Sequence, residues 1–168
     1  MFITIRPESP SDIPAIHILT KAAFLNAPHA AHTEQFIVDA LRKADALSLS
    51  LVAKNDGVIV GHVAISPVSI SDGASGWYGL GPISVAPKHQ QKGIGSKLMM
   101  EVLQQLKKMG AAGCMLVGDP AYYARFGFKR EPSLVYSDLP SEYFQVISFI
   151  QPLPQGTVKF HQAFGAQG

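Results

Sequence analysis

The sequence predicts a mixed α/β fold in a single domain. The chain has 168 residues, of which 47% are hydrophobic and 15% charged, a length and composition typical of one globular domain with a sizeable core. Its periodic segments come in the order strand, two helices, long antiparallel run, then alternating strands and helices. This order favours a mixed, largely antiparallel sheet flanked by helices. Because no repeat, low-complexity tract or linker interrupts it, we expect one domain over residues 1–168, with a core to about residue 150 and a C-terminal extension over 151–168.

The first third of the chain predicts one strand and two helices. The stretch "FITIRPES" alternates and indicates a strand, after which Ser9 or Ser11 is suited to cap a helix that runs to about residue 26. Thr33 is suited to cap a second helix over residues 34–44. The apolar residues expected to face the core are Ile13, Ile16, Ala23 and Phe24 in the first helix, and Ile37, Ala40, Leu41 and Ala44 in the second.

A hairpin and a further strand follow. The stretches "SLSLVAKN" and "VIVGHVAISPVSI" are joined at Asn55-Asp56-Gly57, a strong signal for a tight β-turn. "GWYGLGPISVAP" then predicts a strand that ends near Pro87. Together these segments form the long antiparallel run.

The clearest helical period lies over residues 94–109. Apolar residues recur there every four positions, and Gly110 is placed to end the helix. The recurring residues are Ile94, Leu98, Val102 and Leu106.

The last third predicts three strands and a short helix. "AAGCMLVG" indicates a buried strand, and "DPAYYARF" a short helix with Asp119 as N-cap and Pro120 at its first position. "EYFQVISFI" and "GTVKFHQAF" indicate two more strands. An exposed C-terminal strand could pair two subunits, so a homodimer is possible.

Charge and cysteine content exclude several classes of protein. The net charge is only +2 and no long basic run occurs, which disfavours nucleic acid as a partner. Cys114 is the only cysteine, so no internal disulfide can form. No apolar stretch reaches the ~20 residues needed to cross a membrane, and "MFITIRPESP" lacks the features of a signal peptide. We therefore expect a cytoplasmic protein with no membrane partner.

Two glycines stand where a strand ends and a helix begins, in "HQQKGIGSKLM". The start of a helix offers free N–H groups and a partial positive charge, and glycine lets an anion approach the backbone, so this corner is suited to hold a phosphate. A tight turn without a ligand would use the same glycines. A Walker A loop is excluded because no glycine stands at the required earlier position, and a dinucleotide fingerprint because Leu98 replaces its third glycine.

The pattern that fits is Gln90-x-x-Gly93-x-Gly95 after "ISVAP", followed later by "DPAYYARFGF". Both blocks, in this order and spacing, resemble the GCN5-related N-acetyltransferase (GNAT) family, and "LGPISVAP" is similar to its YhbS-like branch. The resemblance covers most of the chain. It implies a sheet with one splayed strand pair, "GPISV" beside "CMLV", that admits acetyl-coenzyme A (acetyl-CoA).

The resemblance also implies which residues bind acetyl-CoA. The loop would hold its pyrophosphate, the preceding strand would pair with its pantetheine arm, and Asp119 would replace a family asparagine whose usual position is taken by Leu116. The implied cofactor-binding residues are Ile83, Ser84, Val85, Gln90, Gln91, Lys92, Gly93, Ile94, Gly95, Ser96 and Asp119. No metal is implied.

Direct transfer from acetyl-CoA to an amine needs a proton acceptor, a stabilised oxyanion and a proton donor for the sulfur. Tyr123, four residues before Gly127, matches the family's tyrosine acid, although a core aromatic would fit the same place. The strand before the loop contains no carboxylate to act as base. The remaining candidates for the base are Glu34, Asp39, His29 and His32, and a water chain or an amine that is already neutral would also serve.

The function expected from these residues is an N-acetyltransferase that moves an acetyl group from acetyl-CoA to a primary amine of a small molecule or peptide. Two alternatives stay open. The missing strand carboxylate leaves room for an acyl-CoA-binding sensor without catalysis, and a different acyl chain or a hydroxyl acceptor would suit the same fold.

Overall fold

The computed structural model of the chain describes residues 2–28, 30–137 and 139–168, so the prediction for His29 lies outside the described residues. Contacts divide the chain into two compact units. The N-terminal unit comprises Met1–Ser66, Gly81–Val102 and Gln162–Gly168, and the C-terminal unit comprises Pro67–Leu80 and Leu103–His161. The prediction that the chain behaves as a single domain stays a prediction.

The main sheet has the hydrogen-bonded strand order β1-β2-β3-β5-β6-β8. Pairing is antiparallel for β1 with β2, β2 with β3, and β6 with β8, and parallel for β5 with β6. The strands are β1 (Ile3–Pro7), β2 (Leu49–Asn55), β3 (Val58–Pro67), β5 (Trp77–Val85), β6 (Gly113–Val117) and β8 (Phe144–Ser148). The mixed, largely antiparallel sheet is as predicted.

The hairpin between β2 and β3 forms at the predicted place. Asp56 and Gly57 both have positive φ, 50° and 82°, the arrangement that a two-residue turn between twisted strands requires. The turn pairs Asn55 with Val58 and, further along, Val52 with His62. Residues two apart on one strand share a face, so this register decides which polar side chains meet.

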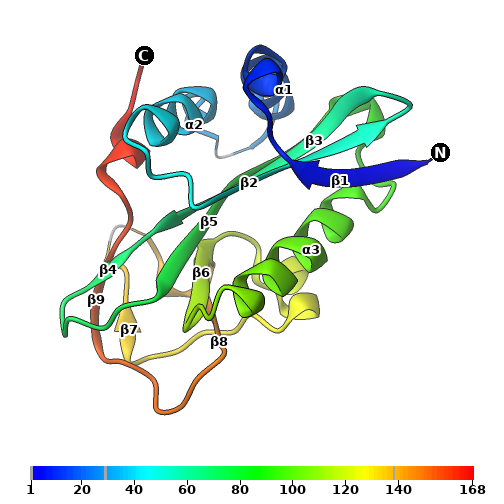
Figure 1. Ribbon diagram of the computed structural model, residues 1–168. Coiled ribbons are helices and arrows are strands. Elements are labelled where there is room, and N and C mark those ends of the chain that lie inside the picture. Colours follow the sequence, from blue (N-terminus) through cyan, green and yellow to red (C-terminus); the bar gives the residue numbers. More distant parts are fainter. Residues whose placement is uncertain (1, 29, 138) are drawn as a thin grey trace. The chain divides into compact units, whose positions relative to one another are not determined.

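Helices cover both faces of the sheet in the N-terminal unit (Figure 1). Helices α1 (Ile13–Phe24) and α2 (Glu34–Lys43) pack on one face, where Ile16, Val38 and Val52 form a buried cluster. Helix α3 (Ile94–Lys108) packs on the opposite face: a side-chain carbon at Gly61 would lie 3.0 Å from side-chain atoms of Ile94 and Leu98. Since neighbours along a strand alternate, His62 points to the face of α1 and α2.

The first helix differs from the prediction at its start. A separate 3₁₀ turn, Pro10–Asp12, precedes α1, with Ser9 as its N-cap and the Asp12 carboxylate accepting from the Ser9 N–H at 2.7 Å. Arg6 also donates to Asp12, at 2.7 Å and 3.0 Å, and Asp12 is the residue that precedes α1. Of the predicted apolar stripe, Ile16 is buried and the others are partly exposed.

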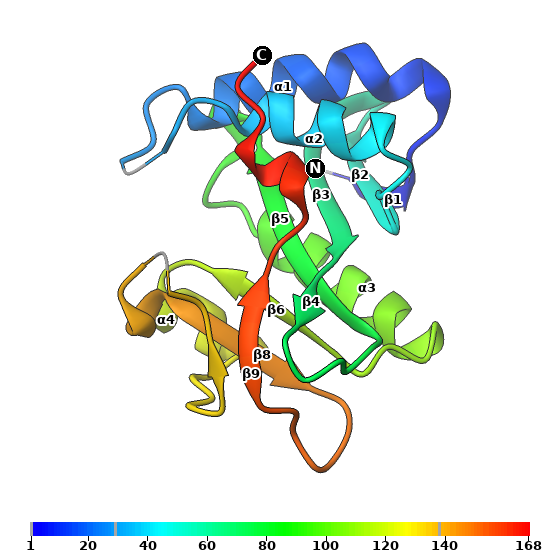
Figure 2. The same ribbon diagram turned by 90° about the vertical axis from the view of Figure 1, so that its left-hand side faces the viewer.

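A second, smaller sheet has the order β4-β9-β7 and belongs to the C-terminal unit (Figure 2). Its strands are β4 (Ser69–Ile70), β7 (Leu134–Val135) and β9 (Gly156–Lys159). β9 pairs with β4 on one edge and with β7 on the other. The exposed C-terminal strand that we expected to be available for a second subunit is therefore already paired on both edges within this chain.

The rest of the C-terminal unit consists of a short helix and a core. Helix α4 (Pro120–Tyr123) continues into the 3₁₀ turn Ala124–Phe126, and a further 3₁₀ turn, Ser141–Tyr143, precedes β8. Trp77 is only 2% exposed and packs in the core with Met115 and Phe144. Cys114 is fully buried, and burial raises the pKa of its thiol.

No helix among the residues that the structure describes is both long and apolar enough to span a membrane.

The last helical segment is the 3₁₀ turn Gln162–Gly165, which lies in the N-terminal unit. There Ala163 packs against Ile37 and Leu41 of α2.

Candidate functional site

The glycine loop (residues 90–96) connects a 3₁₀ turn, Pro87–His89, to helix α3. Two of its residues have left-handed backbone conformations, Gln91 with φ 64° and Gly93 with φ 84°. The Gln90 side chain turns back and donates from Nε2 to the carbonyl oxygen of Val85, at 3.1 Å. This bond ties the loop to the end of β5, so Gln90 shapes the loop.

The backbone of the glycine loop is open where α3 begins. The Lys97 N–H donates to the Gly93 carbonyl at 3.1 Å, so the N–H groups of Ile94 and Gly95, which precede it, have no acceptor within the helix. A side-chain carbon at Gly93 would meet no atom within 4 Å, and Lys92 beside it is exposed. Open amides at the positive end of a helix form an anion site.

Strand β5 leads into this loop. Its parallel pairing with β6 covers only three residues of each strand, Trp77 to Gly79 against Gly113 to Met115, although β5 continues to Val85. In residues 83–85 the middle one, Ser84, is buried at 2% exposure. A short pairing of this kind is what a splayed strand pair requires.

Tyr123 lies at the end of α4 in a partly buried aromatic group. Its ring makes edge contacts with Tyr122 and Phe128, at centroid distances of 4.9 Å and 6.2 Å. It also covers Gly118, where any side-chain carbon would overlap the ring. Burial, followed by the nearby Tyr122 and Asp119, raises the pKa of Tyr123 to about 12. The hydroxyl therefore stays protonated at neutral pH and is suited to donate a proton.

The other residues expected around Tyr123 have structural roles. Tyr122 packs against Phe126 and lies under the Arg125 guanidinium, 4.7 Å from its ring centre, in agreement with a packing role. Asp119 caps α4, as predicted, by accepting from the Ala121 N–H at 3.0 Å. Its contact with a cofactor stays a prediction.

The carboxylates proposed as bases both accept hydrogen bonds, although Oε1 of Glu34 is buried with no partner among the described residues, and their role as bases stays a prediction. Glu34 accepts a hydrogen bond from the Ala31 N–H at 3.0 Å, and Asp39 pairs with Nδ1 of His17 at 2.7 Å. His32 is exposed, with a positive φ of 62°. Among the described residues, no group of three or more histidines, cysteines and carboxylates could hold a metal ion.

A polar group that was not predicted from the sequence joins strands β2 and β3 to the end of β1 in the N-terminal unit. Arg42 donates through Nε and Nη2 to Glu8, at 3.1 Å and 2.9 Å, and Glu8 in turn accepts a short hydrogen bond from the Ser50 hydroxyl. Ser50 also contacts Nε2 of His62, at 2.8 Å. We call Glu8, Ser50 and His62 the buried relay. Its signal in the sequence is a single histidine inside an apolar strand, "VIVGHVAIS".

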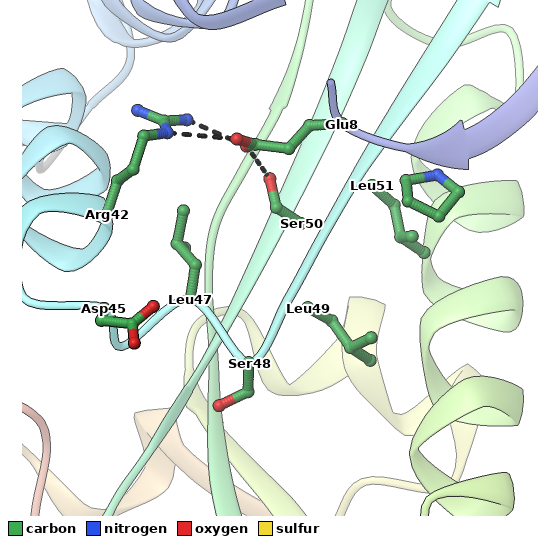
Figure 3. Close-up of a pocket in the computed structure, with 9 residues that line it drawn as sticks. Glu8, Arg42, Asp45, Leu47, Ser48, Leu49, Ser50 and Leu51 are labelled. Atoms are coloured by element: carbon green, nitrogen blue, oxygen red, sulfur yellow. Dashed lines mark hydrogen bonds and ion pairs between the residues drawn. The ribbon is translucent and has the colours of Figure 1, made fainter. Parts of the chain in front are cut away.

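One end of the buried relay borders a pocket. Figure 3 shows the Arg42 and Glu8 side chains meeting there, with Ser50 hydrogen-bonded to Glu8. The pocket has a volume of about 270 Å³. Its lining residues are Pro7, Glu8, Arg42, Asp45, Leu47, Ser48, Leu49, Ser50 and Leu51.

Known proteins share both the sequence pattern and the fold. The profile of the Acetyltransferase (GNAT) family matches residues 14–128. The uncharacterized N-acetyltransferase YhbS of Escherichia coli K12 is 37% identical over 126 residues, which are 74% of this chain and 72% of that protein.

Two solved structures are similar over nearly the whole chain. A GNAT family acetyltransferase from Brucella melitensis, solved in complex with acetyl-CoA, is 48% identical with a TM-score of 0.87, covering 97% of this chain and 98% of that one. YhbS from Escherichia coli, solved in complex with CoA, is 32% identical with a TM-score of 0.89, covering 99% and 93%.

Proposed function

This chain belongs to the Acetyltransferase (GNAT) family, and on that premise we propose that it transfers the acetyl group of acetyl-CoA to a primary amine of a small molecule or peptide. The observation that carries the proposal is the glycine loop. It combines left-handed backbone at Gln91 and Gly93 with open amides at the start of α3. Two relatives of similar fold, solved with acetyl-CoA and with CoA, support the choice of ligand.

In this proposal the glycine loop and the strand before it bind the coenzyme. Amides of residues 91–96 hold the pyrophosphate, and Lys92 adds a positive charge beside it. Backbone groups of residues 83–85 pair with the pantetheine arm, and the Val85 N–H is the proposed donor to the oxygen that becomes negative when the thioester is attacked. The Val85 carbonyl already accepts from Gln90, so it is not counted among those groups.

Tyr123 is the proposed acid. The neutral amine attacks the thioester carbonyl carbon, and the coenzyme leaves with the electron pair of the carbon–sulfur bond. Tyr123 gives its phenolic proton to that sulfur. A pKa of about 12 keeps this proton in place at neutral pH, so the hydroxyl is available to donate to the sulfur as it leaves.

Two variants test the proposal separately for binding and for chemistry. Gly95→Trp places a large ring over the amides of the glycine loop, so we expect acetyl-CoA affinity, measured by calorimetry, to be lost while thermal unfolding stays cooperative. Tyr123→Phe keeps the ring and removes the proton, so we expect roughly a 100-fold fall in turnover with unchanged affinity. Unchanged binding in Gly95→Trp would refute the placement of the pyrophosphate. Turnover of Tyr123→Phe equal to that of the wild type would refute the role of Tyr123 as the acid.

A further inference from the structure

The buried relay fixes the protonation of its histidine. Burial raises the pKa of Glu8, but hydrogen bonds from Arg42 and Ser50 outweigh it and lower that pKa below its usual value, so Glu8 is a carboxylate that only accepts. Ser50 has a single hydroxyl proton, which goes to Glu8. The contact between Ser50 Oγ and His62 Nε2 is then a hydrogen bond that His62 donates. His62 therefore carries its proton on Nε2 and has a lone pair on Nδ1.

That lone pair has no partner in the structure. His62 is 0% exposed, and its Nδ1 is among the buried atoms for which no hydrogen bond is found in the described part of the chain. An unsatisfied buried polar atom costs about 1–3 kcal/mol, and such atoms are rare in folded proteins. In His62 the Nε2–H is oriented by the Ser50 hydroxyl, which is itself held by the Glu8 carboxylate. A neutral imidazole held in this way, with its second nitrogen unprotonated, has the arrangement of a general base.

The strand register places His62 beside the segment that we propose to hold the thioester. The N–H of Ala86, the residue after the end of β5, donates to the Val60 carbonyl of β3 at 2.8 Å, which sets these two residues opposite each other. The Val68 N–H donates to the Trp77 carbonyl at 3.2 Å, so β3 and β5 run antiparallel. Counting two residues forward from Val60 and two back from Ala86, we infer that His62 lies opposite Ser84. Opposed residues share a face of the sheet, and the Ser84 hydroxyl is also buried without a partner in the described part of the chain.

We propose that His62 is the base of the reaction and accepts, on Nδ1, the proton that the amine loses. This rests on the proposed function. The amine nitrogen forms its bond to the acetyl carbon, its proton passes to Nδ1, and the carbon–sulfur bond breaks with the sulfur taking a proton from Tyr123. His62 is then an imidazolium and Tyr123 a phenolate. Proton exchange through solvent restores both, so the net products are an amide and CoA with a free thiol.

Ser50 and Glu8 are positioning residues in this scheme. The Glu8 carboxylate stabilises the imidazolium through the Ser50 hydroxyl, and it remains ionised throughout. The charged groups around the relay are Glu8 after β1 and Arg42 on α2. Further out, Asp39 on α2 pairs with both Arg42, at 3.7 Å, and His17 on α1. Burial has the largest effect on His62 and lowers its pKa; Glu8 opposes that shift by favouring the imidazolium, and Arg42 adds to it.

Kinetics of four variants test the role. His62→Gln keeps an N–H near the Nε2 position for Ser50 but has no basic nitrogen, so we expect kcat to fall roughly 100-fold or more with unchanged KM for acetyl-CoA. Ser50→Ala and Glu8→Gln should lower kcat less, and Glu8→Gln should move the acid limb of the kcat profile to lower pH. Ser66→Ala is the matched control, since Ser66 is a buried residue of β3 whose hydroxyl has no partner among the described residues.

¹⁵N NMR of the His62 ring, in the intact protein at pH 7, tests the role without requiring the amine acceptor to be known. We expect a neutral ring protonated on Nε2, and a change in the Nδ1 signal when acetyl-CoA saturates the protein. A proton on Nδ1, or no response to acetyl-CoA, overturns the proposal whatever the activity. If the wild type acetylates an amine and His62→Gln is equally fast, the base assignment fails and the proposed function stands. If acetyl-CoA binds and no pooled amine is acetylated, both fail.

Discussion

Acidification should destabilise the protein through His62, at pH values where most carboxylates are still ionised. Burial lowers the pKa of His62 from 6.5 to about 4; the nearby Glu8 raises it and Arg42 lowers it. The folded state therefore keeps this ring neutral at a pH where the unfolded chain already binds a proton. Protons bound only by the unfolded state favour unfolding.

The size of the effect follows from the two pKa values. A group whose pKa is depressed by folding contributes stability that is complete above the unfolded pKa, 6.5, and is lost as the pH falls toward the folded pKa of about 4. At 1.36 kcal/mol for each pKa unit, the total is roughly 3 kcal/mol, of which roughly 2.5 kcal/mol is lost by pH 4.5. For a domain of this size that is a large share of the free energy of unfolding.

Urea unfolding at pH 7.0, 6.0, 5.0 and 4.5 measures this loss, with His62→Gln as the reference. Both proteins share every other titrating group, so the difference between their free energies of unfolding reports His62 alone. We expect that difference to change by roughly 2.5 kcal/mol, in favour of the variant, between pH 7.0 and 4.5. A difference that stays constant within about 0.5 kcal/mol would refute a neutral, buried His62.

Four glycine variants give further tests. Gly118→Ala should push the Tyr123 ring from its place, so we expect turnover to fall about tenfold at unchanged acetyl-CoA affinity; normal turnover would contradict the ring position. Gly93→Ala and Gly57→Ala both strain a positive φ in open space, so each should lose about 1–2 kcal/mol, but only Gly93→Ala should weaken acetyl-CoA binding in calorimetry. Gly113→Ala would put a methyl group 2.5 Å from the Ile147 carbonyl, so we expect more than about 3 kcal/mol of destabilisation in urea, and a loss below 1 kcal/mol would show that the strand can shift.

Local sequence signals predicted most elements of the fold. The four-residue spacing of α3 and the Asn-Asp-Gly turn of the hairpin are each contained in a short stretch of chain, and both elements form as expected. Strand β7 was missed because it has only two residues, Leu134 and Val135, and exists through its pairing with β9. The prediction that the C-terminal strand has a free edge was wrong for the same reason, since the partners of β9 come from distant parts of the chain.

The glycine loop was visible in the sequence because its chemistry depends on neighbouring residues. The buried relay was not, because positions 8, 50 and 62 are brought together only by pairing of β1 with β2 and β2 with β3. Each of its residues is unremarkable on its own: a carboxylate after a strand, and a serine and a histidine within strands. The base was sought on β5, the strand before the loop, whereas His62 lies on the neighbouring strand β3.

Release of the CoA thiol from acetyl-CoA, measured with pools of amino acids, polyamines, aminoglycosides and short peptides, shows whether the protein transfers the acetyl group. Tyr123→Phe is assayed in parallel. We expect release that depends on at least one amine pool and falls about 100-fold in the variant. Saturable binding of acetyl-CoA without release from any pool would contradict an N-acetyltransferase and would instead indicate a protein that binds the coenzyme without using it.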